Sequence, residues 1–196
     1  MDFVVIYDAC VLYPAPIRDL FIRLGMVGIV RVRWTESILD ECFRSILEQR
    51  PDLNPGALAR TRTLMQQAIP DCNVNGFEHL IEGLTLPDPD DRHVLAAAVR
   101  AGAQAIVTFN LKDFPETALV PYDVEALHPD EYVLDLIDLA PAAVAKVVGE
   151  QATALKNPPM TTGALLDILR DVGLVQSVAR LRAMFGGGIG TEPGDE

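Results

Sequence analysis

The first 128 residues alternate between short apolar runs and longer stretches in which apolar residues recur every three or four positions. Four runs rich in β-branched and aromatic residues predict strands, at residues 3–7, 29–32, 105–109 and 124–127. The periodic stretches predict helices, one ending near residue 26 and others at residues 35–49, 54–69 and 88–102. This alternation predicts an α/β fold, with a short central parallel sheet between two layers of helices.

Capping residues mark the starts of three of these helices. Thr35 directly precedes an apolar stripe and predicts an N-cap, and Asn54, followed by a proline, predicts another. Asp88 with Asp91 three residues later matches a capping box, and Gly102 supplies a stop at the other end of that helix. The local chemistry therefore sets helix boundaries in the same places as the apolar periodicity.

The pattern changes after residue 128, where no further strand is predicted. Four amphipathic stretches predict helices, at residues 129–139, 141–155, 162–172 and 174–185. The last residues, GGGIGTEPGDE, have almost nothing to bury and predict a disordered tail. We therefore expect a sheet-containing domain at 1–128, a helical extension at 129–185 and a disordered tail at 186–196.

Composition indicates a soluble globular protein. The chain has 196 residues, of which 49% are hydrophobic, enough for one core and a small appendage. No apolar run approaches the roughly 20 residues that span a bilayer, and the N-terminus lacks the basic region of a signal peptide. The three cysteines are odd in number and unpatterned, which predicts reduced thiols in a cytoplasmic protein.

The net charge of −12 argues against indiscriminate binding to nucleic acids. The charge is unevenly distributed, because residues 18–62 carry eight arginines and six acids. The planar guanidinium suits phosphate recognition, so Arg18, Arg23 and Arg44 are candidate RNA-binding residues. The alternative is that these arginines lie on solvated helix faces, paired with nearby carboxylates.

Acidic residues follow the predicted strands or open the next helix. Asp8 follows the first strand, Asp88, Asp90 and Asp91 open a helix, and Asp113 follows the third strand. Because the carboxyl ends of parallel strands meet at one edge of a sheet, these side chains are expected to converge there. Clustered carboxylates repel one another unless a cation neutralises them, and Mg²⁺ prefers such oxygen ligands. Without a ligand, the same acids would serve only as turn residues and helix caps.

Two further residues near this edge have ambiguous patterns. Glu41 lies opposite the buried stripe of its predicted helix, so the pattern alone makes it solvent-facing. His93 follows Asp91 by two residues and is a candidate general base, although a surface or capping histidine fits equally well.

Asp8, Glu41, Asp91 and Asp113 resemble the acidic set of the PIN-domain nucleases. In that family an Asp ends strand 1, as in VVIYDACVL, and a Glu lies in an early helix, as in SILDECF. A third acid opens an alanine-rich helix, as in DPDDRHVLAAA, and a late strand leads to Asp-Phe, as in IVTFNLKDF. The resemblance spans residues 3–128 and looks most like VapC-type toxins that carry extra C-terminal helices. Where many members have Asp, this chain has Asn110.

This resemblance implies a PIN-like three-layer α/β/α fold and a Mg²⁺- or Mn²⁺-dependent endoribonuclease. Asp8 and Asp91 would be direct metal ligands, and Asp113 would take the remaining place in the metal site. Glu41 would complete or orient the metal–water shell, and Thr108 and Asn110 would position it. The implied partners are a structured RNA, such as tRNA or ribosomal RNA, a cognate small antitoxin and a second copy of the chain in a homodimer.

Three other classes share part of this pattern. A haloacid-dehalogenase-type phosphotransferase needs a second Asp two residues after the first, where this chain has Cys10. A phosphoacceptor receiver domain could use Lys112 but needs an acidic pair near the N-terminus, which is missing. The remaining alternative is a non-catalytic PIN fold that binds RNA or docks a protein, consistent with the net charge and with Asn110.

Overall fold

A parallel sheet of four short strands organises the first part of the chain. The computed structural model describes residues 3–156 and 158–186. The chain divides between Pro129 and Asp130 into two compact units. In the first unit the strands lie in the order β2-β1-β3-β4 and are β1 (Val4–Tyr7), β2 (Arg31–Arg33), β3 (Ala105–Val107) and β4 (Glu125–Leu127). All three pairings are parallel, with Ile6 aligned with Arg33 on one side and Ile106 on the other.

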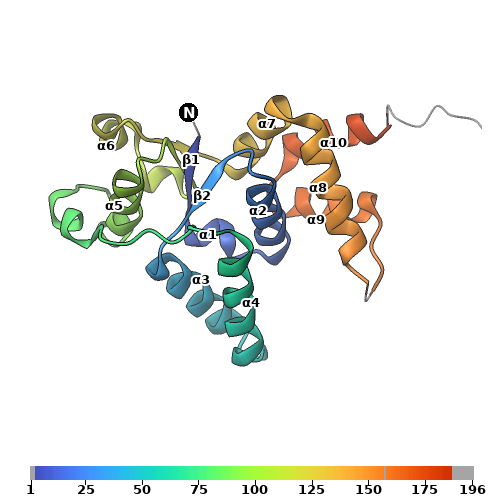
Figure 1. Ribbon diagram of the computed structural model, residues 1–196, viewed down its shortest axis with the longest axis horizontal. Helices are drawn as coiled ribbons and strands as arrows, with labels where there is room; N and C mark the ends of the chain where they lie inside the picture. The colour runs from blue at the N-terminus through green and yellow to red at the C-terminus, as the bar shows by residue number, and fades with distance from the viewer. Residues whose placement is uncertain (1–2, 157, 187–196) are drawn as a thin grey trace, which may run out of the picture. The chain divides into compact units, whose positions relative to one another are not determined.

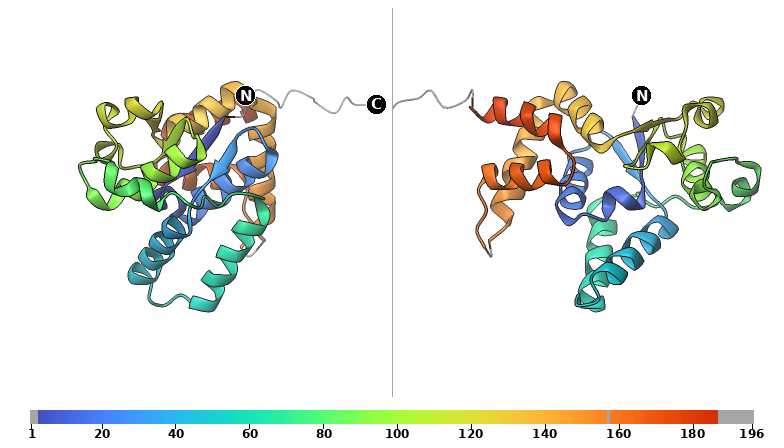
Figure 2. Two further views of the ribbon diagram at one scale, coloured as in Figure 1. Left: turned by 60° about the vertical axis from the view of Figure 1, so that its left-hand side comes forward. Right: turned by 180° about the vertical axis from the view of Figure 1, so that it is seen from behind.

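Helices cover both faces of this sheet, as predicted. Figures 1 and 2 show α2 on one side of the strands and α5 on the other, while α3 and α4 form a hairpin that extends away from the sheet. The helices of this unit are α1 (Ala9–Leu12), α2 (Ala15–Val27), α3 (Glu36–Gln49), α4 (Pro55–Ala68), α5 (Arg92–Ala101) and α6 (Glu116–Leu119). Short 3-10 turns are η1 (Glu78–Gly83), η2 (Pro89–Asp91), η3 (Leu111–Asp113) and η4 (Val120–Tyr122). The predicted three-layer α/β/α fold with a central parallel sheet is confirmed.

The core lies at the middle of the sheet, where strands are covered on both faces. Val5, Ile6 and Tyr7 are fully buried, as are all three residues of β3. Two strands buried on both sides read as continuous apolar runs rather than alternating ones. Burial of each Val and Ile side chain among them stabilises the fold by about 1.5–3 kcal/mol. The backbone that carries Asp8 therefore emerges from the buried middle of the sheet.

Helix starts follow the predicted caps in two cases and depart from them in a third. The Thr35 hydroxyl accepts a hydrogen bond from the Ile38 amide, and the Asn54 side chain accepts from two amides of α4, which confirms both caps. Asp88 caps the turn η2 through the amide of Asp90. The capping box expected for Asp91 is wrong, because the chain makes a 3-10 turn before α5 begins and the Asp91 side chain forms no cap hydrogen bond.

Apart from an isolated β-bridge between Lys156 and Pro159, the described residues of the second unit form helices and their connections. The helices are α7 (Pro129–Leu139), which starts at the boundary, α8 (Pro141–Ala154), α9 (Thr162–Asp171) and α10 (Val175–Gly186). The buried carboxylate of Asp130 accepts hydrogen bonds from the amides of Gln176 and Ser177 and from the Ser177 hydroxyl, tying the start of α7 to the start of α10. The predicted tail lies, from residue 187 onward, outside the described residues. No helix in the described part is both long and apolar enough to cross a membrane.

Candidate active site

Asp8 lies at the carboxyl edge of the sheet, directly after β1. Its backbone amide still donates to the carbonyl of Val107, so the residue is held by both central strands. One carboxylate oxygen accepts from the Ala9 amide at 2.7 Å. The other accepts from the Thr108 hydroxyl at 2.7 Å and from the Cys10 thiol at 3.1 Å. These contacts fix the Asp8 side chain from two segments that are 100 residues apart in the chain.

Burial dominates the electrostatics of Asp8, which is only 4% exposed. Removal from water raises the pKa of the Asp8 carboxyl, and the hydrogen bonds from Cys10, Thr108 and Ala9 oppose that rise. The Thr108 hydroxyl also accepts a bond from the Asn110 amide, and the Cys10 sulfur accepts one from the Phe109 amide. The loop that follows β3 is thus attached to Asp8 by a continuous set of hydrogen bonds.

An acidic pocket opens beside Asp8, between α3, the start of α5 and the loop after β3. It encloses about 690 Å³. Its lining contains seven carboxylates and one arginine, and comprises Ser37, Asp40, Glu41, Arg44, Ser45, Glu48, Asp88, Asp90, Asp91, His93, Asn110 and Asp113. Three of the four acids singled out from the sequence line this pocket, and the charge of the fourth, the buried Asp8, raises the pKa of one of them, Asp91.

Asp91 experiences the mutual repulsion of these acids most clearly. Burial, together with the charges of Asp8, Asp88, Asp113 and Glu41, raises the pKa of Asp91 to about 6. Its side chain makes no cap hydrogen bond to α5 that would oppose this rise. The structure thus brings the acids from β1, α3, α5 and the β3 loop into one interacting group.

Glu41 is half-exposed rather than fully solvent-facing, and it lies on the wall of the acidic pocket. Its carboxylate oxygen Oε2 is 3.5 Å from Nε2 of His93, which belongs to the first turn of α5. Asp113 lies in the turn η3, mostly buried, with the exposed Lys112 ammonium 4.0 Å away. Asn110 is exposed and lines the same pocket.

Two family models match this chain. A family model for the PIN domain matches residues 4–112, more than half of the chain. The chain belongs to the PIN-domain family. A second model, described as the VapC50 C-terminal domain, matches residues 129–183. The PIN resemblance, with its VapC-type helical extension, is therefore confirmed.

One relative is the Mycobacterium tuberculosis protein named "Putative ribonuclease VapC50". It is 48% identical over 98 residues, an alignment that covers 50% of this chain and 57% of the relative. The match thus spans little more than half of the relative's length. No solved structure matches the chain.

The three arginines proposed to bind RNA occupy different environments in this PIN domain. Arg18 donates to the carbonyls of Leu12 and Tyr13, and burial lowers the pKa of its guanidinium. Arg23 pairs with Asp19 one helical turn away. Arg44 is exposed, lines the acidic pocket and forms no ion pair with the described residues. Of the three, Arg44 alone combines a position at the pocket with a guanidinium that no carboxylate of the described residues holds.

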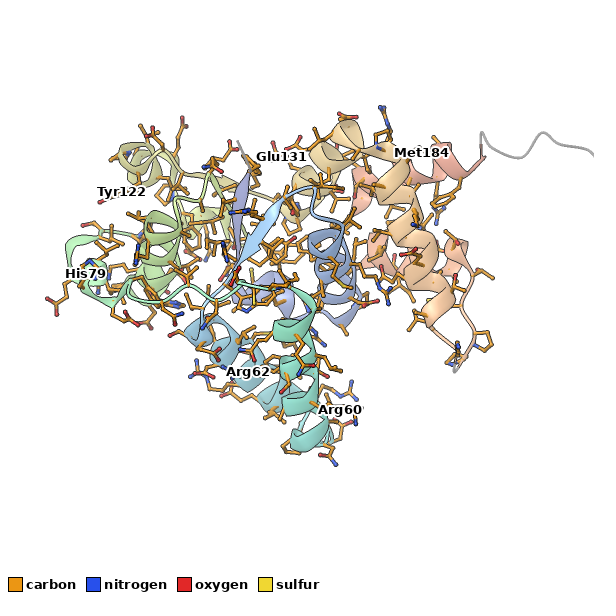
Figure 3. The ribbon with its side chains drawn as sticks, in the orientation of Figure 1. Arg60, Arg62, His79, Tyr122, Glu131 and Met184 are labelled. Carbon is orange, nitrogen blue, oxygen red and sulfur yellow. The ribbon has the colours of Figure 1, made fainter. Side chains whose placement is uncertain are left out.

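Other arginines of this segment also have partners. Arg62 belongs to α4 and pairs with Glu36 and Asp40 of α3. Figure 3 shows it with Arg60 on the hairpin. The sequence alternative of paired helix faces is therefore correct for Arg23 and Arg62. Arg50 likewise pairs with Asp52, so three of the eight arginines in residues 18–62 are matched by nearby carboxylates.

The donor set suits a hard divalent cation in its chemistry. Across residues 3–156 and 158–186, no three His, Cys, Asp or Glu side chains are grouped closely enough to hold a metal ion as they stand. The side chains that line the pocket nevertheless offer carboxylate and amide oxygens, the ligands that Mg²⁺ and Mn²⁺ prefer. The repulsion that raises the pKa of Asp91 is also what a bound cation would offset. The residues fit such an ion, provided that the exposed acids adjust toward it.

Two residues of the site, Cys10 and His93, have no decisive signal in the sequence. Cys10 was noted only as the residue that excludes a phosphotransferase, yet its thiol bridges Asp8 and the backbone of Phe109. His93 contacts Glu41 across two helices. Neither contact follows from local periodicity, although a polar residue two positions after a strand-ending Asp would be a usable signal for the first.

Proposed function

We propose that this chain is a divalent-metal-dependent endoribonuclease and the toxin of a toxin–antitoxin pair. The observation that carries the proposal is the acidic group itself, in which Asp91, Glu41 and Asp113 line one pocket and the buried Asp8 lies close enough for its charge to raise the pKa of Asp91. A structural role would favour pairing these acids with cations or caps, whereas Asp91 has neither among the described residues. PIN-domain membership and the likeness to "Putative ribonuclease VapC50" support the reaction class.

In the proposed mechanism Asp8, Asp91 and Asp113 hold the cation, and Glu41 completes or orients its water shell. When bound, the metal would supply an activated water and offset charge on the scissile phosphate. Thr108 keeps the Asp8 carboxylate oriented through its 2.7 Å hydrogen bond. Asn110 presents its amide group to the pocket in the place where many relatives carry Asp, and Arg44 offers its guanidinium for an RNA phosphate.

The activity is tested with the purified full chain and mixed tRNA and ribosomal RNA. We expect cleavage in Mg²⁺ or Mn²⁺, none after chelation, and none for Asp8→Asn or Asp91→Asn. Asp135→Asn removes one exposed charge from α7 and is the matched control that should cut normally. Wild-type rates from either active-site variant would refute the site assignment.

The same assay distinguishes the proposed nuclease from a second candidate function, a non-catalytic PIN-fold module that binds RNA or docks a protein. That alternative draws on Asn110 and on the absence of a preassembled ligand group among the described residues. A chain that binds RNA equally with and without metal, and never cuts it, would establish the alternative.

We further propose a small cognate antitoxin as the protein partner, on a homodimer of this chain. The acidic pocket would attract a basic segment, and an arginine fork can engage two carboxylate oxygens. Expression of the chain alone should arrest growth, co-expression of the antitoxin should relieve the arrest, and Asp91→Asn should be harmless. A harmless wild type would contradict the toxin role without bearing on the nuclease chemistry.

A further inference from the structure

His93 is the one described side chain that makes a polar contact with Glu41. Its Nε2 atom lies 3.5 Å from Glu41 Oε2, and the contact joins α3 to the first turn of α5. The imidazole is 18% exposed, whereas Glu41 is 40% exposed. The other ring nitrogen, Nδ1, is buried and has no hydrogen-bond partner in the described part of the chain.

This environment selects one tautomer of a neutral imidazole. A neutral ring has one N–H donor and one bare acceptor nitrogen. With the proton on Nε2, the donor nitrogen lies 3.5 Å from a carboxylate oxygen, and only an acceptor is left unpaired at Nδ1. With the proton on Nδ1, a buried N–H would have no acceptor and the Nε2 lone pair would face the carboxylate. The first arrangement is more favourable, because a buried unpaired donor costs about 1–3 kcal/mol.

The contact also matters for Glu41 itself. Three rotatable bonds separate its carboxylate from α3, and ordering such a side chain costs about 1.5–2 kcal/mol of conformational entropy. A donor fixed by burial in α5, two residues after Asp91, restricts those rotations in the direction of the acidic pocket. The effect does not require His93 to touch metal or substrate.

We propose that His93 is a positioning residue, which as an Nε2–H donor holds the Glu41 carboxylate at the acidic pocket and thereby strengthens divalent-metal binding. This inference rests on the proposed function, since it concerns the same pocket. The alternative is that the His93 ring only fills space and does not position Glu41. The two views predict different effects on metal binding when His93 is replaced by a side chain of equal length that has no donor.

Gln and Met provide that comparison. The Gln Nε2 atom is as many bonds from Cα as the His Nε2 atom, and Met has similar length and good helix propensity but no donor. In titration calorimetry of the full chain with Mn²⁺ alone, His93→Met should weaken binding roughly tenfold or more, as found for partners that orient metal ligands. His93→Gln should stay within about threefold of wild type by the same reasoning. Equal losses in both variants would favour the space-filling role and overturn the proposal.

A double-mutant cycle with Glu41→Ala tests whether the effect passes through Glu41. His93→Met should add no further loss of Mn²⁺ affinity once Glu41 is absent, because the two residues act as one unit. An undiminished loss in the Glu41→Ala background would overturn the proposal. Thermal unfolding of each variant without metal monitors folding.

Nitrogen NMR of the metal-free chain gives a readout that needs neither metal nor RNA. The neutral His93 ring should show the Nε2–H tautomer, and the Glu41→Ala variant should shift its population toward the other. An Nδ1–H ring in the wild type would overturn the proposal. A wild type that binds no Mn²⁺ would instead refute the proposed function, whereas normal Mn²⁺ binding by both the wild type and His93→Met would refute the inference alone.

Discussion

Replacement of Asp91 by Asn should stabilise the metal-free protein at neutral pH while abolishing its activity. The pKa of Asp91 rises from 3.8 to about 6 because of burial and the surrounding carboxylates. Such a rise means that the charged form of Asp91 destabilises the folded protein by ~3 kcal/mol. Water in the open pocket screens part of this energy, so we expect roughly half of it to be recovered in the variant. Loss of a negative charge near the start of α5 offsets about 0.3–1 kcal/mol, which leaves a net gain of ~1 kcal/mol.

The sign of the pH dependence follows from the direction of the shift. A carboxyl group with a raised pKa contributes stability that is complete below its unfolded value of 3.8 and is lost as pH rises through about 6. The advantage of the Asp91→Asn variant should therefore be largest near pH 8 and shrink as the pH falls toward 4.

Urea unfolding in the presence of a chelator measures this directly. Wild type, Asp91→Asn and the control Asp135→Asn are compared at several pH values, with the free energy of unfolding extrapolated to water. Mn²⁺ should reverse the order, since metal at about 100 times its Kd adds ~2.7 kcal/mol to a wild type that binds it. Repulsion at Asp91 is refuted as the cause if Asp91→Asn is no more stable than wild type near pH 8, or if its advantage persists unchanged on acidification.

Other contacts support further predictions. Thr108→Val removes the hydroxyl that donates to Asp8 and should destabilise the chain by about 1–3 kcal/mol in urea unfolding, with weaker Mn²⁺ binding; unchanged stability would mean that the hydrogen bond is dispensable. Asp130→Ala removes the acceptor of three hydrogen bonds in the helical unit and should cost roughly 2–4 kcal/mol, against about 1 for Ser177→Ala; equal losses would contradict this ranking. Arg44→Ala should weaken RNA binding and lower its salt dependence by about one phosphate contact, whereas Arg23→Ala should do neither.

Much of the fold could be predicted because its signals are local. Thr35 and Asn54 act on amides two or three residues away, so their caps can be recognised without tertiary structure. The second strand was predicted at residues 29–32 but lies at Arg31–Arg33, since pairing with β1 rather than apolar character decides where the ladder runs.

The candidate site could be predicted only in outline. Asp8 and Asp91 were placed correctly at the edge of the sheet by the rule for parallel strands. The capping role expected of Asp91 failed because the chain takes a tighter turn at Pro89, which leaves the carboxylate facing the pocket. Glu41 seemed solvent-facing because a helical wheel contains no information about α5. Cys10 also contacts Thr108 and Phe109, which lie about 100 residues away and beyond the reach of any sequence window.

The three hydrogen bonds accepted by Asp8 divide the acidic group into a fixed member and adjustable ones. A carboxylate offers about four lone-pair positions, and protein donors already occupy three of them. Asp8 therefore has room for about one more partner, and the direction of that bond is set before any cation arrives. Asp91 makes no cap hydrogen bond and can follow the ion, whereas Glu41 lies beside His93. Any tolerance of the pocket for different cations would therefore come from acids that can move, and not from Asp8.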